Sequence, residues 1–231
     1  LPGNKVIFEE INQDLGLVFS YSWSNSERFG FVKTSRIGNE AEAECTISVL
    51  DGLCNVLPFG VTRQTQTSLS TLLDAYKQAE RVAGLPAGIF TLSSILTDRA
   101  EPCESLRATV AWSTGFDEPD ILLSQDQIEA FCSGAPVTSE RFVRGKRGAF
   151  LIHSSFPLDP GSHKAWYIVA DVNQGSSQVA ELVQEIGQGI SPAALEADIE
   201  AGTRRLVQLV GSADGLQYSA DGLVAARHFS N

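Results

Sequence analysis

Two segments near the amino terminus alternate apolar and polar residues, which is the period of a strand with one face in solvent. The first runs from Leu17 to Trp23 and the second from Ala43 to Val49. Residues 37–42 between them read IGNEAE, and their Gly-Asn pair favours a reversal of the chain. The pattern predicts an antiparallel sheet that forms one face of a large β-sandwich.

Beyond Pro58 the apolar spacing becomes helical and then returns to strands. Leu69, Leu73, Tyr76 and Val82 recur at helical spacing, which predicts one helix of about four turns over 69–82. Further strands are expected at 89–96, 106–112, 149–153 and 165–172. The last of these, AWYIVADV, is apolar on both faces and should lie centrally in its sheet.

Shorter helical patterns follow. Ser124 and Gln127 have the spacing of a capping box, which predicts a short helix between strands. Ser176 and the Ser191-Pro192 pair each begin an amphipathic helix, and Glu200 and Arg204 form an i,i+4 pair on the second. We therefore expect a mainly β fold with decorating helices, divided into a sandwich domain over 1–175 and a helical linker over 176–231.

Composition and charge limit which ligands and which cellular location we expect for this protein. The chain has 231 residues, 43% of them hydrophobic, enough for a substantial core, and its net charge of -11 disfavours nucleic acid as a ligand. It contains no apolar run of about 20 residues, and its amino terminus lacks the plan of a signal peptide, so we expect a cytoplasmic protein without membrane contact. Because it begins at Leu1 and contains no Met, we expect an excerpt of a longer protein.

Polar residues that could do chemistry are densest in the segment TDRAEPCESLR at 97–107. Two carboxylates held close together can act as acid and base on a glycosidic bond. Their separation decides whether the reaction retains or inverts the configuration of the sugar. The alternative is a loop in which arginines neutralise neighbouring carboxylates. The charged residues of this cluster are Asp98, Arg99, Glu101, Glu104 and Arg107.

Other chemistries have less support in the sequence. The three histidines are far apart and the four cysteines form no C-x-x-C pair, so no metal site and no cofactor is predicted. His153 follows a strand, where we expect a satisfied, partly buried side chain. A Ser-His-Asp triad would need a nucleophile, and no G-x-S-x-G motif places one. Trp23, Trp112 and Trp166 are predicted to pack in the core, although flat aromatic faces also suit sugar rings.

Several longer segments together resemble a known family: the amino-terminal region of large bacterial proteins of the cellobiose phosphorylase type. The resemblance extends from about Phe8 to Asn231. The segments that carry it are SERFGFVKTSRIGN (26–39), VLDGLCNVLPFGV (49–61), LLDAYKQAE (72–80), FTLSSILTDRAEPCESLRATVAWS (90–113) and YIVADVNQ (167–174).

This resemblance implies a β-supersandwich of the galactose mutarotase-like kind, followed by helices that lead to an (α/α) barrel beyond this chain. In such architectures catalysis belongs mainly to the barrel, so no catalytic residue is carried over to this chain. It implies a non-catalytic amino-terminal domain, a scaffold and rim of a saccharide site, whose parent would be a glycoside phosphorylase or glycoside hydrolase. The residues expected to reach the sugar are Asp98, Arg99 and Glu101.

Two alternatives remain open. The domain alone could act on a saccharide, which would require two of Asp98, Glu101, Glu104 and His153 to converge in a cleft. It could instead be a pure protein-interaction domain. The resemblance implies carbohydrate, the barrel of the parent chain and a second copy as partners. If the last helix packs on a barrel, its apolar residues should be exposed in this chain or covered by a substitute partner such as a second copy: Leu195, Ile199, Leu206 and Val210.

Overall fold

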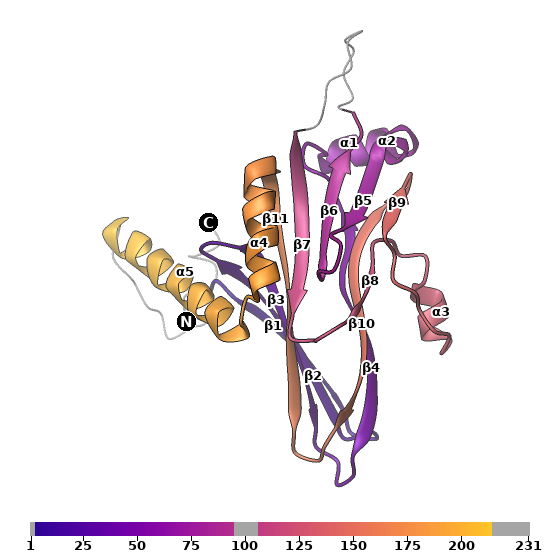
Figure 1. Ribbon diagram of the computed structural model, residues 1–231. Coiled ribbons are helices and arrows are strands. Elements are labelled where there is room, and N and C mark those ends of the chain that lie inside the picture. Colours follow the sequence, from indigo (N-terminus) through magenta and orange to yellow (C-terminus); the bar gives the residue numbers. More distant parts are fainter. Residues whose placement is uncertain (1–2, 95–105, 214–231) are drawn as a thin grey trace. The chain divides into compact units, whose positions relative to one another are not determined.

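The computed structural model describes residues 3–94 and 106–213, and the chain is mainly β (Figure 1). Its strands form an eight-stranded and a three-stranded antiparallel sheet, so the predicted fold class is confirmed. The chain divides into two compact units. The first holds the described residues within Leu1–Cys45, Leu158–Val169 and Ile190–Asn231, and the second holds Thr46–Pro157 and Ala170–Gly189.

The first unit is built on an antiparallel meander. Strands β1 (Val6–Asn12), β2 (Leu17–Ser26) and β3 (Gly30–Asn39) are neighbours in that order, and the first part of β11 (His163–Gly175) follows β3. Leu17 pairs with Asn39 at one end of the hairpin. The Asn39 amide then donates to the carbonyls of Ala43 and Leu158, both at 2.9 Å, which fixes the chain as it leaves β3.

Helix α5 (Pro192–Ala213) packs against β2 within this unit. It begins where predicted, because the Ser191 hydroxyl accepts the Ala194 N–H at 3.1 Å. The expected exposure of its apolar face is wrong for Leu195 and Ile199, which are buried, whereas Leu206 and Val210 are half-buried.

Polar contacts reinforce this packing of α5. The Asp198 carboxylate accepts hydrogen bonds from the Ser26 hydroxyl and, at 3.0 Å, from the Arg28 N–H. The Tyr167 hydroxyl donates to Glu196, and burial together with that hydrogen bond and the negative charge of Glu196 raises the pKa of Tyr167. The helix is therefore held to the first unit by apolar burial and by hydrogen bonds at several points along its length.

The second unit contains two layers of strands. Strands β4 (Cys45–Val56), β10 (Gly148–Leu158) and β8 (Asp120–Leu122) form the three-stranded sheet in the order β4-β10-β8. The prediction that 17–23 and 43–49 share one sheet is therefore wrong: β2 pairs with β3, which includes the predicted turn residues 37–39. The other layer continues from β11 through β7 (Arg107–Thr114), β6 (Ala87–Leu92), β5 (Lys77–Arg81) and β9 (Phe142–Arg144). Phe90 of β6 lies against Gly148 of β10, and Phe150 lies near Gly88, so the core of this unit sits between the two layers.

The predicted helix over 69–82 is wrong in extent. The chain forms α1 (Arg63–Ser68) and α2 (Ser70–Tyr76), and residues Lys77–Arg81 are the strand β5. That strand is hydrogen-bonded on both sides, to β6 and to β9, and its buried Ala79 lies opposite Phe90. Pairing with two neighbouring strands satisfies this backbone and overrides a helical spacing that only local sequence supports.

The other sequence predictions for this unit are mostly confirmed. A short helix, α3 (Ile128–Cys132), does lie between strands, but Ser124 does not cap it: the Ser124 hydroxyl donates to Glu140 at 2.8 Å. Helix α4 (Ser176–Gln188) begins at the predicted residue. Trp112 and Trp166 are buried, each in its own unit, whereas Trp23 is half-buried. None of the helices in the described part of the chain has the length and apolar content to cross a bilayer.

Strands β4 and β10 approach closely at Gly52, which allows a specific prediction. A Cβ atom at Gly52 would lie 2.0 Å from the carbonyl oxygen of Phe150, a backbone atom that cannot rotate away. We expect Gly52→Ala to lower the free energy of unfolding by at least about 2 kcal/mol, because the two strands must separate. Urea unfolding followed by circular dichroism measures this change.

Gly187 provides the matched control for this substitution. It lies in α4 of the same unit, and a Cβ atom there would meet nothing within 4 Å. Gly187→Ala should leave stability unchanged or raise it by up to about 1 kcal/mol through helix propensity. Equal effects of the two substitutions would contradict the close approach of β4 and β10.

Candidate functional site

The residues that the sequence singled out for saccharide contact cannot be placed. Asp98, Arg99 and Glu101, with Glu104, lie outside the described residues, so their expected role remains a prediction. Arg107 of the same segment is described: its guanidinium donates to the Asn173 carbonyl at 3.2 Å and to the Gln178 side chain at 3.3 Å.

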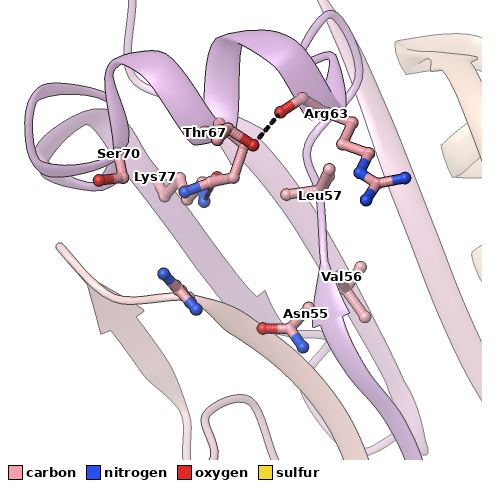
Figure 2. Close-up of a pocket in the computed structure, with 9 residues that line it drawn as sticks. Asn55, Val56, Leu57, Arg63, Thr67, Ser70 and Lys77 are labelled. Atoms are coloured by element: carbon pink, nitrogen blue, oxygen red, sulfur yellow. Dashed lines mark hydrogen bonds between the residues drawn. The ribbon is translucent and has the colours of Figure 1, made fainter.

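A pocket of about 370 Å³ lies in the second unit, where β4 ends beneath the helices α1 and α2 (Figure 2). Its volume is at the lower end of the range for small-molecule sites. Figure 2 shows the side chains of the helices on one side and the end of β4 on the other. The residues that line it are Asn55, Val56, Leu57, Arg63, Gln66, Thr67, Ser70, Lys77 and Arg147.

Local sequence fixes the helical wall of this pocket. Thr62 is the N-cap of α1, and its hydroxyl accepts the Thr65 N–H at 3.0 Å. The Thr67 hydroxyl donates to the Arg63 carbonyl at 2.9 Å, the bond drawn in Figure 2. Asn55, the penultimate residue of β4, has a φ of 56°, a left-handed conformation that Asn tolerates better than most residues. These features redirect the chain at the pocket's edge.

Lys77 is the most deeply buried charge of the pocket, with 3% of its side chain exposed. Its ammonium group lies 2.7 Å from the Asp74 carboxylate and also donates to the Gln66 side chain. The Gln66 amide in turn donates to Asp74 at 3.3 Å. A buried ammonium needs such partners, and this triangle ties α1 and α2 to the first residue of β5.

The ionisation of Asp74 reflects these neighbours. Burial alone would raise the pKa of Asp74, but hydrogen bonds from Lys77 and Gln66 and the positive charges of Lys77 and Arg147 together lower it below its usual 3.8. The carboxylate therefore stays ionised near neutral pH and compensates the charge of Lys77.

The remaining charges of the pocket are positive. Arg63 and Arg147 both line it, and in the described part of the chain neither forms an ion pair. No carboxylate is among the described lining residues. In a chain whose net charge is -11, this is a local concentration of positive charge with amides and hydroxyls beside it. Such a lining suits a small ligand that carries hydroxyl groups and a negative charge.

A second cavity, of about 410 Å³, lies in the first unit beside α5. Most of its polar side chains already have hydrogen-bond or ion-pair partners. Asn4 donates to Thr203 at 2.8 Å, Arg205 binds Glu27, and Ser26 binds Asp198. This cavity therefore offers a ligand fewer available groups than the pocket of Figure 2.

His153 is partly buried and hydrogen-bonded, as predicted. Its Nδ1 lies 3.1 Å from Oδ2 of Asp120, and its Nε2 lies 3.2 Å from the Ser48 hydroxyl. Sequence reasoning missed both partners, because Ser48, Asp120 and His153 come from three different strands and no local motif marks them. It likewise missed Arg63, Lys77 and Arg147. Among the described residues, no three His, Cys, Asp or Glu side chains are grouped to hold a metal ion.

Comparisons with known proteins leave the family open. No family model and no curated protein matches this chain. One similar solved structure is described as "Putative kojibiose phosphorylase from human microbiome": identity is 12% and the TM-score 0.47, over 87% of this chain but only 22% of that one. A protein of Synechocystis sp. PCC 6803 is similar at 8% identity and a TM-score of 0.34, over 73% of this chain and 61% of that one. Neither likeness assigns an activity.

The low pKa of Asp74 implies a pH dependence of stability. Because its pKa in the folded chain lies below the unfolded value, its ionised form stabilises the fold above about pH 3.8, and this contribution is lost as pH falls through the folded pKa. We expect Asp74→Asn to be less stable than the wild type at pH 7, and the difference to shrink below pH 4. Urea unfolding of both proteins between pH 3 and 7 measures it. A difference independent of pH would contradict the charge interaction.

Proposed function

We propose that this chain is the amino-terminal sandwich domain of a carbohydrate-active protein, a scaffold that binds an anionic saccharide in the pocket of Figure 2. The carbohydrate part rests on the sequence resemblance described above. The anionic part rests on one observation: Arg63 and Arg147 line the pocket, and no carboxylate is among its described lining residues. A sugar phosphate or a uronate combines the two properties.

The chemistry of the lining supports such a ligand. Arginine pairs with phosphate or carboxylate groups through two parallel N–H bonds, and Arg63 and Arg147 form no ion pair with the described residues. Asn55, Thr67 and Ser70 can exchange hydrogen bonds with sugar hydroxyls. Val56 and Leu57 supply an apolar floor. No aromatic ring lines the pocket among the described residues, so an extended neutral glucan has no stacking platform there.

The same lining argues for binding rather than for cleavage. Hydrolysis or phosphorolysis of a glycosidic bond needs a carboxylic acid close to the bond, and no such group lines the pocket among the described residues. Lys77 is held by Asp74 and Gln66 and is not placed to act as an acid. The chemistry on glycosidic bonds would then belong to the parent protein, as the resemblance implies. Its (α/α) barrel and a second copy of this chain are the protein partners under this proposal.

A calorimetric titration tests the proposal with glucose 6-phosphate, inorganic phosphate, galacturonate, glucose and cellobiose. We expect glucose 6-phosphate and galacturonate to bind measurably tighter than glucose or cellobiose, and added salt to weaken that binding. Arg63→Gln and Arg147→Gln should each weaken binding of glucose 6-phosphate about 10-fold or more, because each removes a charged hydrogen-bond donor.

Arg204→Gln is the control, since it removes the same charge from an exposed site on α5 in the other unit. It should leave affinity unchanged. Two results would contradict the pocket as the site of anionic sugar binding. One is equal affinity for glucose and glucose 6-phosphate, and the other is full affinity in the Arg63→Gln and Arg147→Gln double variant. If inorganic phosphate binds as tightly as glucose 6-phosphate, the pocket is an anion site, and the proposal that it recognises a saccharide is wrong.

A further inference from the structure

The outer face of the three-stranded sheet carries a continuous chain of hydrogen-bonded side chains. Asp120 lies on β8 directly opposite His153 on β10, and the two side chains meet at 3.1 Å. On its other side, Nε2 of His153 lies 3.2 Å from the hydroxyl of Ser48 on β4. Since the sheet order is β4-β10-β8, three adjacent strands bring serine, histidine and aspartate together in a row.

Hydrogen bonding sets the direction of proton transfer along this row. The Ser139 hydroxyl donates to Oδ1 of Asp120 at 2.8 Å, which leaves Oδ2 for the imidazole. An ionised carboxylate only accepts hydrogen bonds, so the neutral imidazole carries its proton on Nδ1. The lone pair of Nε2 then faces the Ser48 hydroxyl, which is the arrangement of a general base beside its nucleophile.

The surroundings hold the imidazole in place and leave the serine accessible. The ring of Phe131 on α3 meets the His153 ring edge-on, with centroids 5.7 Å apart, and 19% of the His153 side chain is exposed. Next to His153 the same outer face is apolar and covered: Ile128 and Val137 pack on a cluster of Leu122, Ala149 and Leu151. Ser48 lies beyond this cover and is exposed. The histidine therefore stands at the boundary between an apolar surface and solvent.

We propose that Ser48 is the nucleophile of an acyl-transfer site, with His153 as general base and Asp120 as the residue that positions it. The substrate class is esters of small acyl groups, which an open sheet face can admit. The Ser155 hydroxyl donates to the Ser48 oxygen at 3.1 Å, which leaves the Ser48 proton for Nε2 of His153. This site is independent of the pocket and does not rest on its anionic ligand.

The reaction balances without any cofactor. The Ser48 oxygen bonds to the acyl carbon as the C–O bond of the ester breaks, and the Ser48 proton passes through Nε2 of His153 to the leaving alcohol. Water then attacks the acyl-serine, gives one proton to Nε2, and releases the acid as Ser48 regains its proton. Asp120 keeps its charge throughout and stabilises the imidazolium that forms in each half-reaction.

Covalent labelling with a fluorophosphonate probe tests this proposal directly. The probe phosphonylates a serine at a useful rate only when a base activates the serine hydroxyl. We expect intact-protein mass spectrometry to show one adduct on the wild type and peptide mapping to place it on Ser48. Ser48→Ala should abolish that adduct. His153→Gln should slow labelling at least about 100-fold, the usual contribution of a general base.

Further variants separate reactivity from structure. Asp120→Asn should slow labelling of Ser48 while the urea midpoint changes little, a result that a merely structural role for Asp120 would not give. Ser177→Ala, at an exposed serine of α4, is the control and should label like the wild type. Absence of an adduct at Ser48, or equal labelling rates in the wild type and His153→Gln, would overturn the proposal and leave the row as a surface hydrogen-bond network. Saccharide binding is unaffected by any of these results.

Discussion

The pairing of β4 with β10 is the constraint on which both sites in the second unit depend. Gly52 lets the two strands approach so closely that a Cβ atom there would overlap the Phe150 carbonyl. On one side of this contact, β4 presents Ser48 to His153 of β10. On the other side, β4 ends at Asn55 and Val56, which form one wall of the pocket. A shift of β4 along β10 by one residue would turn Ser48 away from His153, because side chains alternate between faces.

The second constraint is electrostatic. Burying the Lys77 ammonium is costly unless it is paired, and Asp74 and Gln66 supply the pairing. Their triangle places α1 and α2 over the start of β5, and so it builds the helical wall of the pocket. Asp74 pairs directly with Lys77 and only senses the charge of Arg147, and neither Arg63 nor Arg147 forms a salt bridge among the described residues. The local positive charge in an acidic chain is thus a consequence of how the pocket is held together.

The two sites differ in a way that suits different chemistry. The pocket is concave, cationic and without a described carboxylate, which favours holding an anion and offers no general acid. The row from Asp120 to Ser48 lies on an open sheet face beside a covered apolar patch, and it offers a base and a nucleophile without an enclosing pocket. The first arrangement recognises a ligand, and the second activates a hydroxyl group.

The sequence by itself determined the class of fold and most of its strands. Alternation marks β2 and the start of β4, the doubly apolar run at 165–172 marks the central β11, and Ser191-Pro192 marks the start of α5. These features are local, because the exposed face of a strand and the cap of a helix depend on residues that are close in sequence. Tertiary structure alone decided that 77–81 is a strand, since its helical spacing is overridden by hydrogen bonds to β6 and β9.

Both candidate sites were also decided only by tertiary structure. Ser48, Asp120 and His153 are separated by more than thirty residues from one another and meet because three strands lie side by side. Arg147 joins Arg63 and Lys77 in the same way, from a distant part of the chain. Periodicity reports which face of an element is buried, but it holds no information about which distant residues share that face. That depends on strand order and register, which are fixed by the close approach at Gly52 and by pairing across the whole unit.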